Sequence, residues 1–501
     1  MDLQRFFDYW NLNENPFQAE EARNDAVYAR TLEDAVTHPD FQKIYGNPEN
    51  PSTALVFGEK GSGKTAMRLM MERRLEAYNE TRSGNRVWRV RYDDLNPILD
   101  RLSHNLSLSS PEDCLDKIRL SDHQDAILSL AVTELLDSVL GDDKTEFAKN
   151  RRRALRRMHR EKRFDLAILG LLYDQPRHGE RQNRWVRLKR LLRAGMLFNR
   201  SVHGTLVLLA GLAGLTGLAA WRFSEAVGWE WQALAIVGVA AFAGLGVAWL
   251  TRAARKYFRC RRTQREVRAV SHEPKAFTRG LWDLPDDAGI LCLIPEKGDQ
   301  DKRYEATQRF LRIVEELGYS SLIVFVDRVD EPVLVNSDTE RMRKLIWPLL
   351  NNKFLQQEQF GAKMLLPIEL GHKIESEVPE FLRQARLDKQ NMVNPLRWTG
   401  ATLYDLCTSR FRNCQREDAE RLEELKDLFE EEVGHKDLVE ALDQMHQPRD
   451  AFKFLYAVIL RHCQNTPGES EHYKIPKLTL DYVRQEQSER VMNLYRGVSV
   501  R

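Results

Sequence analysis

Two segments without a formal charge constrain the fold of this 501-residue chain more than any other feature. They are Val202–Trp221 and Trp231–Leu250, each twenty residues long. At a rise of about 1.5 Å per residue, a helix of this length spans ~30 Å, the thickness of the hydrocarbon core of a bilayer. Core helices of soluble proteins usually keep a polar stripe, and these segments have none. The sequence therefore predicts two membrane-spanning helices that bind the lipid bilayer.

Basic residues flank this pair of segments on both outer sides. Arginine and lysine are abundant in 181–200 and in 252–268, whereas the connector Arg222–Glu230 holds one arginine and two glutamates. Because positive charge favours the cytoplasmic side, both ends of the hairpin are expected there. We therefore expect a bacterial-type inner (plasma) membrane location, with both termini in the cytoplasm. Anionic lipid headgroups are the expected partners of the basic flanks.

A further basic run, Arg151–Arg163 (RRRALRRMHREKR), lies upstream of the hairpin. Three interpretations compete: a solvated helix face, a lipid-headgroup patch and a nucleic-acid patch. The nearby hairpin favours anionic lipid, and the solvated face comes next. Nucleic acid is disfavoured as a partner because no recognised binding motif accompanies the charge.

The bulk composition hides these local extremes. A mean hydropathy of −0.52, a net charge of +2 and 30% charged residues are typical of a soluble protein. The hydrophobic content of 42% excludes a wholly disordered chain. The six cysteines include no CxxC pair, which argues against a disulfide scaffold and a cysteine-type zinc site.

The most specific short motif is Gly58-x4-Gly63-Lys64-Thr65, between the apolar run Ala54–Phe57 and a helix-like stretch. This is the P-loop pattern in its strand–loop–helix context. Glycines allow successive N–H groups to converge on phosphate oxygens at a helix N-terminus, which favours anions. Lys64 would contact the β and γ phosphates of ATP, and the Thr65 hydroxyl would ligate Mg2+. The predicted nucleotide-binding residues are Gly58, Glu59, Lys60, Gly61, Ser62, Gly63, Lys64 and Thr65.

An acid that holds the magnesium ion is expected at the end of a second buried strand. Leu322–Val326 are five apolar residues followed directly by Asp327, as in a parallel strand whose terminal carboxylate projects into the site. Asp327 is therefore the predicted Walker B residue and, with Thr65, the predicted metal ligand. Asp330 and Glu331 are candidates for the catalytic group that orients or deprotonates water, with Glu331 preferred. The alternative is that both acids merely lie in the loop after the strand.

Two further strands are predicted in the same sheet, Arg86–Tyr92 and Ala362–Leu370. In sheets of this kind, the strand beside Walker B often ends in a polar residue that senses the γ-phosphate. Glu369 is the nearest polar candidate, and Pro367 leaves its register open.

The separation between the two nucleotide motifs is unusually long. Thr65 and Leu322 are separated by 256 residues, far more than such a sheet needs, so the hairpin is expected to be inserted within the nucleotide-binding domain. In this respect the chain resembles the KAP family of P-loop NTPases, part of the STAND and AAA-like group. Members of that family commonly carry two transmembrane segments between Walker A and Walker B. The run Asp327-Arg328-Val329-Asp330-Glu331 is similar to the family's Walker B in acidity and differs in order.

The resemblance implies further site residues. Gln447–Leu455 (QPRDAFKFL) looks like the start of a lid helix whose arginine reaches the γ-phosphate as a second sensor. This gives Arg449 a catalytic role, with an arginine on an exposed helix turn as the alternative. Asn394–Arg410 looks like the segment after the last strand, and Asn11–Phe17 looks like the Asn-Pro-Phe segment that lies near adenine.

The expected fold class is α/β, with a P-loop NTPase three-layer sheet and helices on both faces. An inserted two-helix transmembrane hairpin and an all-α C-terminal lid complete it. The expected domains are an N-terminal segment (1–50), the first half of the P-loop domain with Walker A (51–150), basic juxtamembrane helices (151–200), the transmembrane hairpin (201–250), a basic juxtamembrane segment (251–285), the second half with Walker B (286–375) and the helical lid (376–501).

Two functions remain open. One is a membrane-anchored ATPase that binds Mg-ATP and hydrolyses it to drive a conformational switch, of a signalling or defence type by the resemblance. The other is a non-hydrolysing nucleotide-binding scaffold, because Arg328 stands where many AAA-type ATPases place the catalytic glutamate. A channel or transporter is disfavoured because the uncharged spans line no polar path.

The sequence leaves the partners of this chain largely open. We expect ATP as the nucleotide and not GTP only because the sequence contains no NKxD motif. The sequence leaves open whether the chain forms a homo-oligomer. Arg383 and Arg386 are weaker candidates for arginine fingers that would reach a neighbouring subunit. No motif indicates a protein partner.

Overall fold

The computed structural model shows a mixed α/β protein with a five-stranded parallel sheet. It divides into two compact units: unit 1 is Met1–Leu95 with Ser321–Arg501, and unit 2 is Asn96–Ser320. Residues 96–150, which the sequence places with the P-loop domain, therefore group with unit 2. The structure describes residues 1–17, 22–25, 27–28, 37–106, 108, 110–141, 145–175, 181–192, 209, 211–212, 214–219, 229–266, 274–283, 294, 299, 301–416, 423–467 and 471–498.

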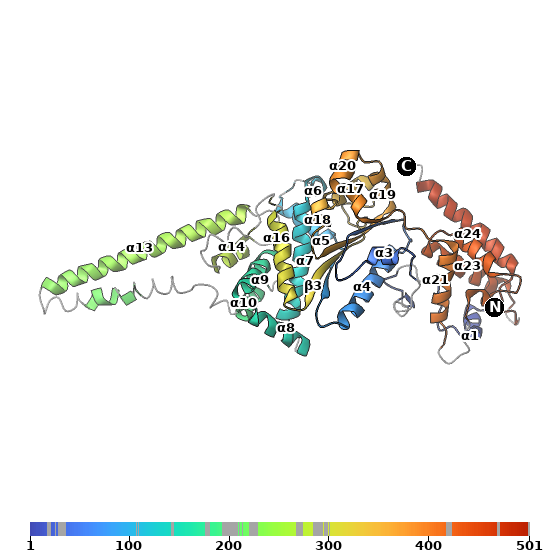
Figure 1. Ribbon diagram of the computed structural model, residues 1–501, viewed down its shortest axis with the longest axis horizontal. Helices are drawn as coiled ribbons and strands as arrows, with labels where there is room; N and C mark the ends of the chain where they lie inside the picture. Colours follow the sequence, from blue (N-terminus) through green and yellow to red (C-terminus); the bar gives the residue numbers. More distant parts are fainter. Residues whose placement is uncertain are drawn as a thin grey trace. The chain divides into compact units, whose positions relative to one another are not determined.

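The sheet of unit 1 has the strand order β2–β3–β4–β1–β5. Figure 1 labels its strand β3. Its strands are β1 (Ala54–Gly58), β2 (Arg86–Tyr92), β3 (Tyr319–Val326), β4 (Phe360–Pro367) and β5 (Asn391–Val393). Parallel pairing aligns Val56 with Leu365 and Val324 with Ala362. Every residue of β1 and β4 is buried, as is typical of parallel strands covered on both faces. Four strands thus lie where the sequence predicts strands, and β4 is the neighbour of β3.

The strand β4 ends earlier than its sequence predicts. The predicted strand Ala362–Leu370 stops at Pro367, and helix α19 (Ile368–Glu375) follows at once with Glu369 in its first turn. Proline has no N–H to donate to a sheet ladder and its fixed φ suits a helix start, so Pro367 separates the two elements. Glu369 therefore lies on a helix and not at the end of a strand.

The carboxyl ends of β1, β4 and β3 meet at one edge of the sheet, because these strands are parallel neighbours. Helix α4 (Lys64–Glu80) begins at this edge, after the loop that follows β1. Met67, Met71 and Leu75 of α4 share one buried cluster with Val56 of β1 and Phe325 of β3. The apolar face of α4 thereby fixes its first turn beside the sheet edge. The shorter elements of unit 1 are α3 (Phe41–Tyr45), α17 (Thr339–Ile346), α18 (Asn352–Leu355), α20 (Pro379–Ala385) and the 3-10 turns Trp347–Leu349, Leu387–Lys389 and Leu425–Leu428.

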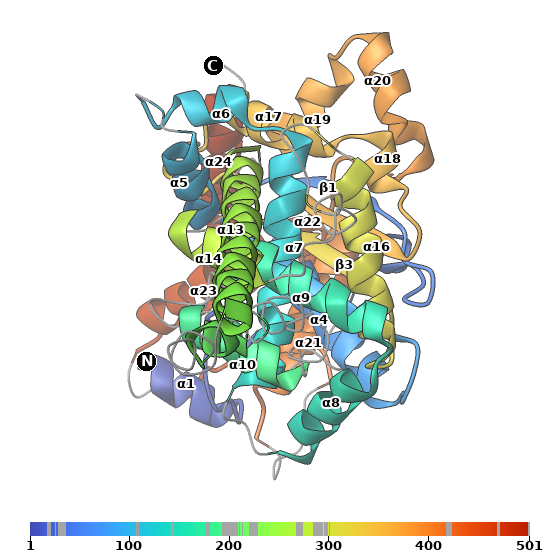
Figure 2. The ribbon, with the colours of Figure 1, turned by 90° about the vertical axis from the view of Figure 1, so that its left-hand side faces the viewer.

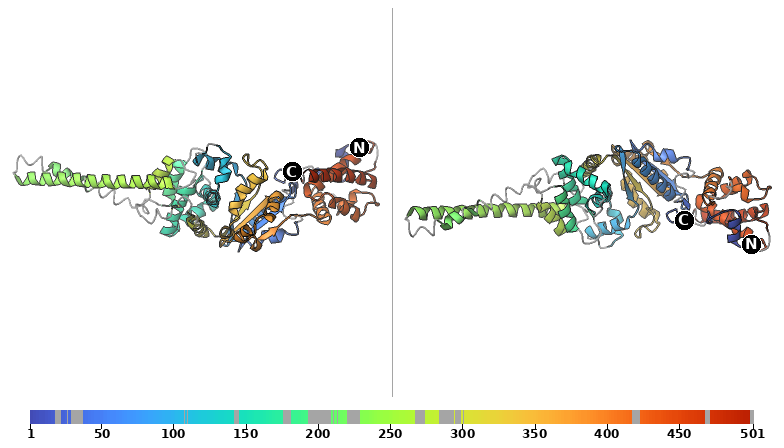
Figure 3. Two further views of the ribbon diagram at one scale, coloured as in Figure 1. Left: turned by 90° about the horizontal axis from the view of Figure 1, so that it is seen from above. Right: turned by 90° about the horizontal axis from the view of Figure 1, so that it is seen from below.

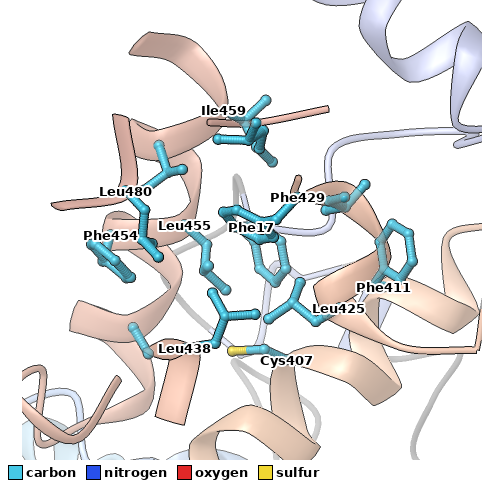
Figure 4. Close-up of a cluster of buried hydrophobic side chains, with 14 of the residues drawn as sticks. Phe17, Cys407, Phe411, Leu425, Phe429, Leu438, Phe454, Leu455, Ile459 and Leu480 are labelled. Atoms are coloured by element: carbon cyan, nitrogen blue, oxygen red, sulfur yellow. The ribbon is translucent and has the colours of Figure 1, made fainter. Parts of the chain in front are cut away.

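The C-terminal part of unit 1 is helical. Its helices are α21 (Gly400–Asn413), α22 (His435–Asp443), α23 (Pro448–Asn465) and α24 (Lys477–Val498), joined by the N-terminal helix α1 (Leu3–Tyr9). Buried apolar side chains from these helices form a single cluster, which includes Cys407, Phe411, Leu438, Phe454 and Leu480 (Figure 4). Pro448 occupies the first turn of α23, where its missing N–H costs nothing.

Unit 2 is built from helices among its described residues. They are α5 (Asn96–Asn105), α6 (Asp113–Lys117), α7 (Leu120–Leu140), α8 (Glu146–Arg157), α9 (Arg160–Tyr173), α10 (Arg181–Leu191), α13 (Trp229–Glu266), α14 (Pro274–Asp283) and α16 (Asp301–Glu315). Helices α7, α9 and α16 lie side by side (Figure 2). Between them, the buried Arg303 guanidinium contacts both carboxylate oxygens of Asp125, at 3.0 and 2.8 Å. This ion pair joins α7 to α16.

Helix α13 contains the second predicted membrane span, Trp231–Leu250, and continues for a further sixteen residues to Glu266 (Figure 3). Among the described residues, the helical segment Ile236–Gln264 is long and apolar enough to cross a membrane. None of its most apolar 18-residue stretch is buried in the structure. Of the first predicted span, Val202–Trp221, the structure describes only 209, 211–212 and 214–219, all helical. The rest of that span lies outside the described residues.

Candidate functional site

The loop between β1 and α4 has a backbone that requires glycine. Gly61 and Gly63 adopt φ values of 95° and 88°, in the left-handed region that side chains disfavour. A Cβ on Gly58 would lie 2.4 Å from Ser62 Oγ, so this position has no room for a side chain. All three glycines of the motif are thus explained by the local geometry.

Lys64 begins α4 and its side chain bends back over the loop. Its Nζ donates hydrogen bonds to the carbonyl oxygens of Gly58 at 2.7 Å and Glu59 at 2.9 Å. Burial lowers the pKa of the Lys64 ammonium, and the negative charges of Asp330, Asp327 and Glu369 act in the opposite direction. The Lys64 side chain therefore lies in the field of three carboxylates, two from the segment after β3 and one from α19.

Thr65 and Asp327 come together although they are 262 residues apart in the chain. Thr65 Oγ1 donates to Asp327 Oδ2 at 3.2 Å, and the Arg328 backbone N–H donates to Asp327 Oδ1 at 2.9 Å. Asp327 is only 1% exposed, because it follows directly on the buried strand β3. The two predicted magnesium ligands thus lie side by side at the carboxyl edge of the sheet.

Arg68 is a buried residue of the site that the sequence motifs do not reveal. Its Nε donates to Asp327 Oδ2 at 3.1 Å and its Nη1 donates to Glu72 at 2.6 Å. Its Nη2 lies 3.5 Å from a carboxylate oxygen of Asp93, directly after β2. The signal for it is an arginine one turn after Lys64 within the otherwise apolar stretch AMRLMM.

The two candidate catalytic bases have different surroundings. Glu331 is paired with Arg328, whose φ of 59° turns the chain sharply after Asp327. Asp330 lies 3.8 Å from Lys60 Nζ, and among the acids around Lys64 it is the one that raises the lysine pKa most. The contacts of the site therefore favour Asp330, whereas the order of residues in the sequence favours Glu331.

Residues of the helical C-terminal part hold the loop from the other side. Trp398 Nε1 donates to Ser62 O at 2.8 Å, and Gln447 Nε2 donates to a carboxylate oxygen of Glu59. The Arg449 backbone N–H lies 3.4 Å from Gly61 O. A Cβ on Gly61 would stand 2.9 Å from Arg449 Cβ, so the first turn of α23 sits directly against the loop.

These groups line one cavity of about 360 Å³ within unit 1. Its charged lining includes Lys64, Asp327, Asp330, Arg449 and Arg410. Its apolar and aromatic lining comes from Tyr28, Phe41, Met67, Met70, Leu406 and Phe452. The cavity thus combines a cationic loop with a region that suits a flat, uncharged group.

Other predicted residues lie outside this cavity. Arg383 and Arg386 are paired locally with Glu380 at 2.6 Å and Asp388 at 3.8 Å, and neither lines the cavity. Of the Asn-Pro-Phe segment, Pro16 accepts a hydrogen bond from Arg410 through its carbonyl oxygen at 2.9 Å. This bond links the N-terminal segment to a wall of the cavity.

The basic run Arg151–Arg163 covers parts of α8 and α9. Arg152 and Arg156 of α8 line a groove with Arg187 and Arg190 of α10, at the carboxyl end of α7. Arg152 Nε donates to Val139 O at 2.7 Å, so part of this charge caps the end of α7. Arg156 and Arg190 are exposed on the same groove.

The donor set at Thr65 and Asp327 fits a magnesium ion. Both supply hard oxygen atoms, and Mg2+ in nucleotide sites takes one or two protein ligands with waters and phosphate oxygens. No cluster of three or more His, Cys, Asp or Glu side chains that could hold a metal ion lies within the described part of the chain.

No protein-family model, curated protein or solved structure matches the chain.

Proposed function

We propose that the chain is a membrane-anchored P-loop ATPase of the KAP type, which binds Mg-ATP and hydrolyses it to drive a conformational switch. The observation that carries this proposal is the convergence of Lys64, Thr65, Asp327 and Arg449 on one cavity. We further propose that the sheet of unit 1 is a three-layer P-loop NTPase sheet with helices on both faces. In this interpretation, the predicted all-α lid (376–501) is represented by the helices α21 to α24.

The chain supplies recognition elements for the phosphates and the magnesium ion of a nucleoside triphosphate. The left-handed glycines orient loop amides toward phosphate oxygens at the start of α4. Lys64, now bonded to Gly58 and Glu59 carbonyls, would transfer its hydrogen bonds to the β and γ phosphates. Thr65 and Asp327 would hold the magnesium ion, which neutralises charge on the phosphates.

Arg449 supports the switch part of the proposal. Its side chain lines the cavity and packs on Gly61, and its buried Nε has no hydrogen-bond partner in the described structure. A γ-phosphate oxygen would satisfy this donor, and the bond would be lost with the released phosphate. Because Arg449 begins α23, the nucleotide state would then act directly on the helical lid.

Whether the chain hydrolyses ATP or only binds it depends on the acids after Asp327, one of which would act as the catalytic base. Asp330 is the better candidate base, since Glu331 is held by Arg328. The second candidate function is a non-hydrolysing nucleotide-binding scaffold. The Arg328–Glu331 pair and the contact of Arg68 with Asp327 favour it, because cations already occupy two of the acids.

The decisive experiment measures nucleotide binding and phosphate release on purified full-length protein. Lys64→Ala should abolish ATP binding while the protein remains folded and membrane-bound, and Lys43→Ala, an exposed lysine of α3, serves as the control. Unchanged ATP affinity in Lys64→Ala would refute the site. Asp330→Asn should lose turnover and Glu331→Gln should keep most of it. Turnover that survives both substitutions means a different base, and no turnover in the unmodified chain favours the scaffold.

We also propose that two spans anchor the chain in a bacterial-type inner membrane, with both termini cytoplasmic. A Cβ on Gly214 would lie 3.2 Å from the Phe242 ring, so the described part of the first segment packs against α13. The side chains of α13 that face outward include Ile236, Val239 and Leu250, as expected for a helix surrounded by lipid. The exposed arginines of the α8–α10 groove would bind anionic headgroups.

A further inference from the structure

A buried ion pair outside the loop motif forms part of the cavity wall. Arg410 of α21 is 3% exposed, and its Nη1 lies 2.6 Å from a carboxylate oxygen of Asp25. Its Nε donates to Pro16 O at 2.9 Å. Both Arg410 and Asp25 line the same cavity as Lys64.

The remaining nitrogen of Arg410 is a buried donor. Its Nη2 has no hydrogen-bond partner in the described structure, although the guanidinium is charged at every accessible pH. Leaving such a group unsatisfied is costly, and buried polar groups in folded proteins nearly always have a partner. Because Arg410 lines the cavity, a ligand can supply the acceptor.

The surroundings of Arg410 select the kind of acceptor. The charge of the guanidinium is already balanced by Asp25, whose carboxylate would repel a phosphate placed beside it. The Phe452 ring lies 4.5 Å from the guanidinium carbon, and Met67 and Leu406 line the same cavity. A flat, uncharged ring that carries hydrogen-bond acceptors fits these groups, whereas a phosphate does not.

We propose that Arg410 is the residue that recognises the nucleobase, with Nη2 donating to a ring nitrogen or carbonyl oxygen of the base. Asp25 is a positioning residue that fixes the guanidinium and can accept from an amino group of the base. The proposal rests on the proposed nucleotide site and adds a base-recognition element to it. It also explains why the Asn-Pro-Phe segment contacts Arg410 through Pro16.

The test compares two ligands that differ by the nucleoside alone. Calorimetry on the full-length protein in detergent measures binding of ATP and of inorganic tripolyphosphate, each with magnesium. Arg410→Lys keeps a cation beside Asp25 and removes the Nη2 donor. It should lower ATP affinity about tenfold to a hundredfold, the range for a hydrogen bond from a charged group, and leave tripolyphosphate affinity unchanged. Arg412→Lys, exposed on the same helix, should change neither.

Each of the other outcomes has a distinct meaning. An unchanged ATP affinity in Arg410→Lys overturns the base-recognition role, and so does an equal loss for both ligands, which indicates phosphate binding or damage to the fold. If Arg410→Lys does not fold, the pair Asp25→Asn/Arg410→Met removes both charges together and is judged by the same two affinities. Failure of the unmodified protein to bind either ligand refutes the nucleotide site itself, a result visible before any variant is made.

Discussion

Lys363 is a buried amine in the sheet that carries the candidate site. It lies within β4, between β1 and β3, and is 1% exposed. Its Nζ donates to Ser52 O at 2.7 Å. Burial lowers the pKa of this ammonium from 10.5 to about 7, and no nearby charge contributes to the shift. A charged lysine at this position should therefore weaken the fold.

Replacing Lys363 by methionine tests this cost, because the two side chains have similar lengths. The unfolded chain binds a proton up to pH 10.5, but the folded chain binds it only below about pH 7. Stability contributed by the neutral amine is therefore fully present above the unfolded pKa and is lost as the pH falls toward the folded pKa. The shift corresponds to ~5 kcal/mol, on the order of 1.4 kcal/mol per pKa unit.

Lys363→Met should consequently be more stable than the unmodified protein near about pH 6, by ~4 kcal/mol, which is the ~5 kcal/mol cost of the buried charge less the ~1 kcal/mol of the lost hydrogen bond to Ser52. This difference should shrink near about pH 10 and then reverse slightly, because methionine lacks the hydrogen bond to Ser52, worth ~1 kcal/mol. Scanning fluorimetry in detergent would show a rise in melting temperature of roughly 10 °C at the lower pH. Lys353→Met, at an exposed position of α18, is the control and should shift little at either pH.

The reasoning is refuted if Lys363→Met lowers the melting temperature at both pH values. It is also refuted if the difference from the unmodified protein is the same at both, since a pH-independent effect would reflect packing alone. Lys353→Met corrects for any general effect of removing a lysine. Because a chain with two compact units can unfold in more than one step, the comparison rests on differences between variants and not on absolute free energies.

Two further predictions concern the site and the membrane. Arg68→Met should lower the free energy of unfolding by about 3 kcal/mol or more, because it leaves Asp327 buried with an uncompensated charge. The control Arg73→Met, on the exposed face of α4, should cost under about 0.5 kcal/mol. Equal melting temperatures of the two variants would contradict the first expectation. Ala226→Cys, in the connector between the proposed spans, should react with a membrane-impermeant maleimide added outside intact cells, and labelling only after lysis would reverse the proposed orientation.

Much of this fold could be predicted from short-range patterns in the sequence. Runs such as Leu322–Val326 are apolar throughout, and a parallel strand covered on both faces needs nothing else to be recognised. The loop motif fixes its own backbone, since Gly61 and Gly63 occupy angles closed to other residues. The position of Pro448 likewise marks the first turn of α23.

Contacts between distant segments could not be predicted in the same way. Arg410 and Asp25 belong to a helix near the end of the chain and a loop near its start, and no periodicity links them. The same holds for Arg68 and Asp327, where only the folded sheet brings the two charges within 3.1 Å. The division after Leu95 leaves no mark in the local pattern, because the helices after it are amphipathic, like those that pack on the sheet.

Unit 1 ends in sequence close to a carboxylate that shares an arginine with the candidate site. Unit 1 continues into unit 2 at Leu95, shortly after Asp93 at the carboxyl end of β2. Asp93 is bound by Arg23 at 2.7 Å and approached by Arg68 at 3.5 Å, while Arg68 also holds Asp327. A magnesium ion at Asp327 would compete with Arg68 for the same carboxylate oxygen, and a displaced Arg68 would change the charge balance at Asp93. Asp93 and Asp327 therefore share one arginine, and their charges are coupled through it within unit 1.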